Sequence, residues 1–151
     1  FDPPVQDGLR DIITQMVRNA IVHGIERPEE RLLSGKPEVG NIMVELESSR
    51  NDYVLAVQDD GQGINLLRLW EKAQTLPQFQ GRSLADVPEQ ELFSLIFISG
   101  FSTAFAETED AGRGVGMDII KASVKEMGGR INIATEAARF TRFRFNFPQP
   151  A

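Results

Sequence analysis

The sequence predicts a two-layer α/β (α+β) sandwich, in which helices cover one mixed, largely antiparallel sheet. Some segments repeat apolar residues at helical spacing, and others alternate apolar with polar residues as strands do. Their order is helix, two strands, two helices, a long loop, helix and two strands, which fits one sheet packed against helices. The 151 residues match the size of a single domain over residues 1–151.

The first half of the chain is predicted to hold one long helix and one hairpin. A polar loop rich in Pro and Gly separates them, with one helical turn inside it. In the hairpin, Ile42, Val44 and Leu46 alternate with other residues, as do Val54 and Ala56. The predicted elements are a helix over Leu9–Ile21 stopped by Gly24, a loop over 26–40 with a turn around 29–33, and strands around 42–46 and 54–58 joined through 48–52.

The second half is predicted to hold three helices, a long loop and a second strand pair. Pro88 suits the first turn of a helix, and Gly128-Gly129 ends another. In the last strand, phenylalanines at 143, 145 and 147 face the core and arginines at 142 and 144 face solvent. The predicted elements are helices over 65–75, 88–98 and 114–127 (apolar at 115, 119, 120 and 124), loops over 76–86 and 99–113, and strands over 130–135 and 140–147.

Composition narrows the possible functions. The chain has no cysteine, which excludes disulfides and thiolate metal sites, and its single histidine, His23, excludes multi-histidine metal sites. The net charge of −6 argues against general nucleic-acid binding. No apolar run approaches the roughly 18–20 residues of a membrane span. The start, Phe1-Asp2-Pro3-Pro4, has no basic, apolar leader, so we expect a cytoplasmic protein without membrane insertion.

Three polar constellations point to a binding site, and the first lies on the opening helix. Gln15, Asn19 and His23 are spaced i, i+4 and i+8, so they share one helix face opposite much of the apolar stripe. They form either a solvated polar face or a row of oxygen and nitrogen ligands beside a site. His23 alone also suits a helix end, where a histidine contacts the last carbonyls.

The second constellation is Asp59-x-Gly61-x-Gly63, directly after a predicted strand. A carboxylate at a strand end can accept a hydrogen bond from an exocyclic amine, and glycines let a planar ring approach the backbone. Such Asp-Gly turns also end many strands without any ligand.

The third constellation is Gly112-Arg113-Gly114-Val115-Gly116, at the start of a predicted helix. Free backbone amides and the positive end of a helix dipole bind phosphate without a basic patch. The spacing is that of neither the P-loop nor the dinucleotide-binding fingerprint.

In this order, the three constellations resemble the N, G1 and G2 boxes of the ATP-binding domain shared by histidine kinases, gyrase and MutL, the GHKL superfamily with its Bergerat-type fold. The closest likeness is to chemotaxis kinases of the CheA type, over roughly residues 9–148. The matching segments are Arg18-Asn19-Ala20-x-x-His23-Gly24-Ile25-Glu26, Glu30-Arg31, Gly35-Lys36-Pro37, Asp59-Asp60-Gly61-Gln62-Gly63-Ile64, Phe97-x-x-Gly100-Phe101-Ser102-Thr103 and Gly112-Arg113-Gly114-Val115-Gly116-Met117-Asp118.

This resemblance implies ATP and Mg²⁺ as cofactors. Asn19 would coordinate Mg²⁺ with His23 close by, and Asp59 would accept the adenine amino group. Residues 99–112 would form a lid over the nucleotide. Ser102 and Thr103 are expected in the site, although their types also suit loop and capping positions. The expected nucleotide-binding residues are Asn19, Asp59, Gly61, Gly63, Ser102, Thr103, Gly112, Arg113, Gly114, Val115, Gly116 and Thr141; the catalytic positions are Gln15, Asn19 and His23.

The chain departs from the family pattern at four positions. Gln15 stands where the CheA pattern has His, and an amide cannot act as a base at neutral pH. Val22 replaces a usual Asp, and Ala104 replaces a commonly basic residue. Phe140 replaces a glycine of the last box, so we expect it to crowd the adenine site.

The resemblance therefore implies transfer of the γ-phosphoryl of Mg·ATP to a histidine on a separate phosphotransfer domain. The other expected partners are a response regulator and the dimerisation and receptor-coupling domains of a longer protein, and this domain alone is expected to be monomeric. Two alternatives stay open: a non-catalytic nucleotide-binding or docking module, suggested by Gln15, Val22 and Phe140, and an ATPase of the gyrase or MutL kind.

Overall fold

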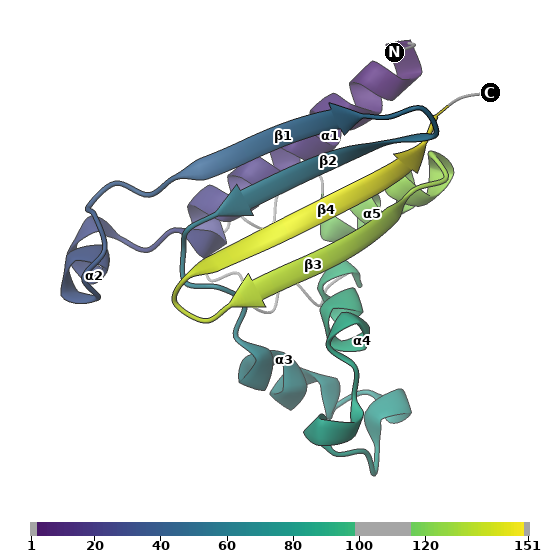
Figure 1. Ribbon diagram of the computed structural model, residues 1–151. Helices are drawn as coiled ribbons and strands as arrows, with labels where there is room; N and C mark the ends of the chain where they lie inside the picture. The colour runs from purple at the N-terminus through teal and green to yellow at the C-terminus, as the bar shows by residue number, and fades with distance from the viewer. Residues whose placement is uncertain (1–2, 99–115, 150–151) are drawn as a thin grey trace.

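A computed structural model describes residues 3–98 and 116–149 of the chain, and these form one sheet with helices on one side. The strands are β1 (Ile42–Ser48), β2 (Asp52–Asp59), β3 (Arg130–Glu136) and β4 (Phe140–Pro148). They lie in the order β1-β2-β4-β3, and each neighbouring pair is antiparallel (Figure 1). The predicted two-layer class is confirmed, and the described part of the sheet is antiparallel throughout.

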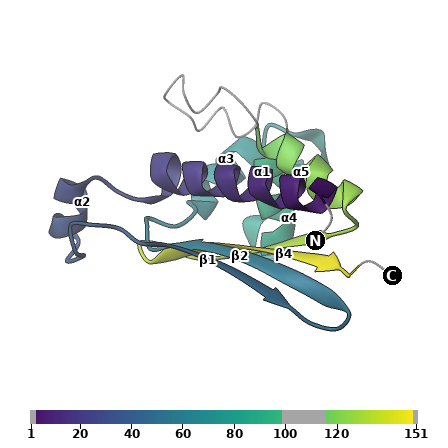
Figure 2. The ribbon, with the colours of Figure 1, turned by 90° about the horizontal axis from the view of Figure 1, so that it is seen from above.

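Most of the helices lie on one face of this sheet, while the short helix at 28–33 lies beyond one end of it (Figure 2). The first predicted helix starts earlier than expected, because Pro3 and Pro4 suit a first helical turn. The helix predicted over 88–98 is a short α-helix that tightens into 3-10 geometry at Ser94–Phe97. The helices are α1 (Pro3–Asn19), continued by a π turn at Ala20–Gly24, α2 (Pro28–Leu33), α3 (Leu66–Ala73), α4 (Glu89–Phe93) and α5 (Met117–Glu126); 3-10 turns lie at Pro77–Phe79 and Leu84–Asp86.

The core lies between the helices and the inner face of the sheet. Phe145 and Phe147 of β4 are buried and the rings of Tyr53 and Phe147 stack at 5.0 Å between centroids, so the face predicted for β4 is confirmed. On β2 the buried residues are Tyr53, Leu55 and Val57, whereas Val54 and Ala56, whose alternation predicted the strand, lie on its other face.

Several apolar residues of the predicted helices and strands are exposed to solvent. Strand β1 is an edge strand, so Val44 and Leu46 remain exposed although their partners on β2 are buried. Ile21 is 61% exposed in the π turn, and Ile119 of α5 is also exposed. No helix among the described residues is both long and apolar enough to cross a membrane.

Candidate nucleotide-binding site

Two buried polar side chains meet where the central strands pair. Asp59 is the last residue of β2, and Thr141 lies directly opposite it on β4. Paired residues of an antiparallel ladder point to the same face, which here is the helix-covered face. Each is 7% exposed. Asp59 and Thr141 are therefore neighbours, as the predicted adenine site requires.

The Asp59 carboxylate is held by one backbone amide. Its Oδ1 atom accepts a hydrogen bond of 2.9 Å from the Gly61 N–H. Burial raises the pKa of Asp59, an effect that the Gly61 hydrogen bond opposes and that the nearby carboxylates of Asp60 and Glu26 increase. Within residues 3–98 and 116–149, Oδ2 of Asp59 accepts no hydrogen bond, so that oxygen suits an amino group of a ligand.

Glycines around this carboxylate make room for close backbone packing. A Cβ on Gly61 would overlap the carbonyl of Gly24, and a Cβ on Gly24 would lie 2.9 Å from both Asp59 oxygens. Gly63 has φ 78° and passes close to the Glu136 carbonyl. The predicted importance of Gly61 and Gly63 thus has a direct steric basis.

The turn between β3 and β4 closes the other side of this loop. The Ala138 N–H donates to the Gln62 carbonyl at 2.8 Å. The Thr135 hydroxyl accepts from the Ile64 N–H at 2.9 Å and lies 3.4 Å from the Thr141 hydroxyl. Ala138 stands in the left-handed region, with φ 66°, where the family pattern has glycine.

Phe140 does not crowd the adenine side, so that expectation is wrong. Side chains alternate along β4, and Phe140 therefore points to the face opposite Thr141. There the Arg142 guanidinium lies over its ring, 5.9 Å from the centroid. The glycine-to-phenylalanine change leaves the Asp59–Thr141 face free.

The carboxyl end of α1 brings two of its three predicted site residues together. Gln15 is buried and its Nε2 lies 3.4 Å from Asn19 Oδ1. The Asn19 amide nitrogen lies 2.6 Å from the sulfur of Met117, the first residue of α5. The face is therefore not uniformly solvated, because Gln15 is buried and Asn19 contacts the start of α5.

His23 lies beyond this pair, in the π turn that extends α1. Its side chain is exposed and its carbonyl accepts from the Gln62 side chain at 2.6 Å. Desolvation by the surrounding protein lowers the pKa of His23 below its usual value, which favours the neutral imidazole. The π turn rotates the chain relative to a regular helix, which is a common distortion near functional sites.

Of the segment predicted to bind phosphate, residues 112–116, the structure describes only Gly116. Gly116 is the N-cap of α5 and lies next to Met117, hence close to Asn19. The proposed lid, residues 99–112, lies outside the described residues. So do the site residues Ser102, Thr103, Gly112, Arg113, Gly114 and Val115.

The side chains around Asn19 fit a magnesium ion held mainly by a nucleotide. The amide oxygen of Asn19 is a hard ligand of the kind that Mg²⁺ prefers. Among the described residues it accepts only a long hydrogen bond of 3.4 Å from Gln15 Nε2. No group of three or more His, Cys, Asp or Glu residues converges to a metal site within residues 3–98 and 116–149. Mg²⁺ commonly uses one or two protein ligands, with phosphate oxygens and water completing its octahedron.

A group of charged side chains lies beside residues 60–63, which are called the adenine loop because the adenine prediction falls there. Arg31 and Lys36 each contact both Glu26 and Asp60. The resemblance included Glu26, Arg31 and Lys36 but gave them no role, and Arg31 and Asp60 are 29 positions apart, so no local pattern joins them.

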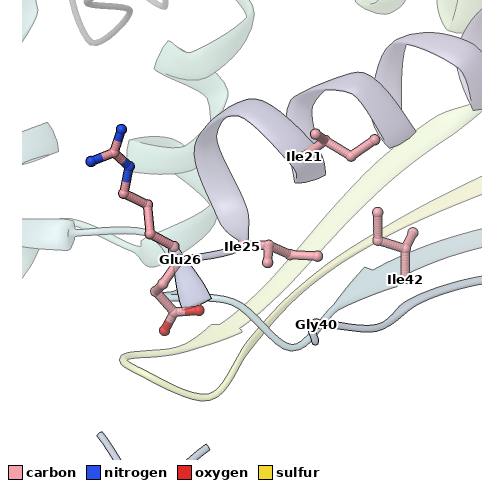
Figure 3. Close-up of a pocket in the computed structure, with 6 residues that line it drawn as sticks. Ile21, Ile25, Glu26, Gly40 and Ile42 are labelled. Atoms are coloured by element: carbon pink, nitrogen blue, oxygen red, sulfur yellow. The ribbon is translucent and has the colours of Figure 1, made fainter. Parts of the chain in front are cut away.

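A shallow hollow lies between the π turn and the start of β1. Figure 3 shows Ile21, Ile25 and Ile42 around it, with Glu26 and Gly40 at its border. None of the predicted site residues lines this hollow. The candidate site is therefore the Asp59 end of the sheet, where β2, the β3–β4 turn and the end of α1 meet (Figure 1).

A two-layer sandwich with a buried carboxylate at the end of a central strand is the arrangement that the sequence resemblance predicted. Residues 5–151 match the family model described as histidine kinase-, DNA gyrase B- and HSP90-like ATPase. The chain belongs to this family.

Within the family, the chain is most informatively compared with chemotaxis kinases. It is 40% identical to the chemotaxis protein CheA of Cereibacter sphaeroides and 39% identical to that of Klebsiella aerogenes, with 97% and 98% of this chain covered. It covers 21% and 22% of those proteins, so it spans about a fifth of their length. The predicted resemblance to CheA-type kinases is confirmed.

Solved structures confirm the fold. The nucleotide-free catalytic domain of histidine kinase ThkA is 16% identical with a TM-score of 0.52, covering 94% of this chain and 65% of that one. The histidine kinase domain of the E. coli osmosensor EnvZ is 21% identical with a TM-score of 0.50, covering 95% and 65%. At these identities, the likeness concerns the fold alone.

Proposed function

We propose that this chain binds Mg·ATP and serves as the catalytic domain of a CheA-like histidine kinase. The observation that carries the proposal is the buried Asp59–Thr141 pair at the ends of β2 and β4. Asp59 accepts the adenine 6-amino group through Oδ2, while Gly61 holds Oδ1. Guanine carries a carbonyl at that position, and two acceptors facing each other exclude it.

The phosphates lie between Asn19 and the start of α5 in this proposal. Asn19 offers its amide oxygen to Mg²⁺, and His23 lies in the π turn that continues α1. Magnesium supplies charge neutralisation for phosphoryl transfer, a reaction that depends mainly on positioning and electrostatics. Gly112 to Gly116 and the lid residues, with Ser102 and Thr103, complete the phosphate contacts.

The acceptor histidine belongs to a separate phosphotransfer domain. In this proposal the chain's one histidine, His23, belongs to the nucleotide site and is not the acceptor. A response regulator, and the dimerisation and receptor-coupling domains of a longer protein, complete the proposed cytoplasmic pathway. Two relatives of the chain are chemotaxis proteins CheA, which supports this assignment.

Phosphotransfer tests the proposal directly. The chain is mixed with γ-labelled ATP, Mg²⁺ and a phosphotransfer domain of a CheA relative. We expect acid-labile, base-stable label on that domain, and less of it with Asp59→Asn. A chain that binds ATP yet leaves the domain unlabelled, alone or within its full-length protein, contradicts the kinase assignment.

One observation favours a second candidate, a nucleotide-binding module without catalysis. Gln15 is buried beside Asn19, and its amide can orient neighbours but cannot accept a proton at neutral pH. Gln15→His separates the two: a gain of roughly 10²-fold or more in transfer, the usual contribution of a general base, identifies a decayed enzyme. Equal transfer by both forms shows that this position needs no base.

A further inference from the structure

A buried charge cluster lies directly behind the adenine loop. Arg31, at the end of the short helix α2, is 1% exposed and forms ion pairs with Glu26 at 3.0 Å and with Asp60 at 3.2 Å. Lys36 forms an ion pair with Glu26 at 2.7 Å. Burial raises the pKa of Glu26, but the Lys36 hydrogen bond and the two positive charges outweigh it, so the pKa lies below its usual value.

Lys36 and Arg31 also donate hydrogen bonds to backbone carbonyls of the adenine loop. Lys36 Nζ donates to the Asp60 carbonyl at 3.0 Å and to the Gly61 carbonyl at 2.9 Å. Arg31 donates to the same Asp60 carbonyl at 3.2 Å. Lys36 thus uses its three donors on three acceptors: two loop carbonyls and Glu26.

Holding these carbonyls fixes the amides of the same peptide planes. A carbonyl and the following N–H belong to one rigid plane and point in opposite directions. With the Asp60 carbonyl turned to Lys36 and Arg31, the Gly61 N–H points to Asp59 Oδ1. With the Gly61 carbonyl turned to Lys36, the Gln62 N–H points to the Gly24 carbonyl at 2.8 Å.

We propose that Lys36 and Arg31 are positioning residues for base recognition, acting through two peptide planes. The plane between Asp60 and Gly61 supplies the amide that binds Asp59 Oδ1, and the plane between Gly61 and Gln62 ties the same loop to the Gly24 carbonyl. This inference rests on the proposed function. An apolar cluster can replace a buried ion pair with little loss of stability. It cannot supply directional donors to the two carbonyls, so the cluster sets the geometry of Asp59 rather than serving as general support.

The test compares Lys36→Met with the same change at an exposed position, Lys72→Met on α3. Each chain is titrated by calorimetry with Mg²⁺ and either a non-hydrolysable ATP analogue or the matching purine riboside analogue, which lacks the 6-amino group. Thermal unfolding of each variant is recorded in parallel, and Lys36→Arg is the conservative variant.

In the wild type and in Lys72→Met, we expect removal of the amino group to weaken binding about tenfold, as for a hydrogen bond to a charged acceptor. In Lys36→Met this ratio falls towards one, because a misoriented Asp59 no longer distinguishes the two ligands. Lys36→Arg, which keeps the charge and its donors, retains most of the ratio.

The outcomes separate this inference from the proposed function. A wild type that binds neither analogue overturns both. A wild type whose affinity falls with Asp59→Asn, but whose ratio is unchanged in Lys36→Met, overturns only the positioning role. A Lys36→Met chain that fails to fold moves the test to Lys36→Arg and Arg31→Lys, and a ratio unchanged in both, each with a shifted melting temperature, contradicts the inference.

Discussion

The two ends of the proposed site differ in how tightly the protein itself holds them. At the base end, Asp59 lies among backbone hydrogen bonds that join the π turn, the adenine loop and the β3–β4 turn. At the phosphate end, the described side chains of Gln15 and Asn19 share a long contact of 3.4 Å, and Asn19 also contacts Met117.

This difference indicates that base recognition is built into the fold, whereas the groups proposed for metal and phosphate keep their polar atoms available for a ligand. Changes that disturb the backbone packing of the base end should therefore cost both stability and binding. Changes at the phosphate end should cost binding alone.

The largest effect is expected from Gly61→Ala. The new Cβ would overlap the Gly24 carbonyl, so the adenine loop must move away from Asp59. We expect a loss of about 3 kcal/mol in unfolding free energy, the upper range for overpacking, together with loss of ATP-analogue binding. Denaturant unfolding and calorimetry measure the two effects.

Gly8→Ala is the matched control, since its Cβ meets only the flexible side chain of Met127 and lies within α1. It should be neutral or stabilising by up to about 1 kcal/mol. A Gly61→Ala chain as stable as Gly8→Ala would show that the base end is not tightly packed.

Asn19→Ala tests the phosphate end. Its polar contacts are few, so we expect unfolding free energy to change by less than about 1 kcal/mol. Binding of the ATP analogue should weaken about tenfold with Mg²⁺ and little without it. Asn132→Ala, at an exposed position of β3, is the control. Equal weakening with and without Mg²⁺ would argue against a metal ligand.

Ala138→Gly should stabilise the protein. Ala138 has φ 66°, and a left-handed conformation costs a residue with a Cβ roughly 1–2 kcal/mol. The greater freedom of glycine in the unfolded chain offsets part of this, so we expect a gain of about 0.5–1 kcal/mol. Ala137→Gly, at the neighbouring position of the turn, should give no gain, and denaturant unfolding of the two variants measures the difference.

Asp59→Asn should have a small, pH-dependent effect on stability. Burial raises the pKa of Asp59, so its charged form weakens the folded state once the pH rises through that pKa. The variant should therefore melt above the wild type at pH 7. The gain should vanish below the unfolded pKa, near pH 4, where aspartate is neutral in both states. A variant that melts below the wild type at pH 7 contradicts this.

Much of the fold follows from local pattern, and the exceptions have physical causes. Helical spacing located α1, α3 and α5, and alternation located the phenylalanine face of β4. The alternation of Val54 and Ala56 located β2, but the buried face is the other one, which contains Tyr53 and ends on the buried Asp59. Edge position, which exposes Val44 and Leu46, is a property of the whole sheet and leaves no local signal.

The site divides in the same way. Asp59, Gly61 and Gly63 were predictable because their spacing encodes a strand end and a tight backbone turn. Thr141 was found through resemblance, and its register opposite Asp59 supports it. The expectation that Phe140 crowds the adenine site was wrong because it did not take into account that neighbouring side chains on a strand point to opposite faces. Arg31 and Lys36 were part of the resemblance, but their contacts with Asp60 were not predicted because only the folded chain brings these residues together.

The most direct test of the account is calorimetric titration of the chain with a non-hydrolysable ATP analogue, with and without Mg²⁺, for the wild type and Asp59→Asn. The account predicts magnesium-dependent binding that Asp59→Asn weakens about tenfold or more, as expected for loss of a charged acceptor. Absence of binding at millimolar analogue, or equal affinity of the two chains, would contradict the assignment of Asp59 and its surroundings as the adenine site.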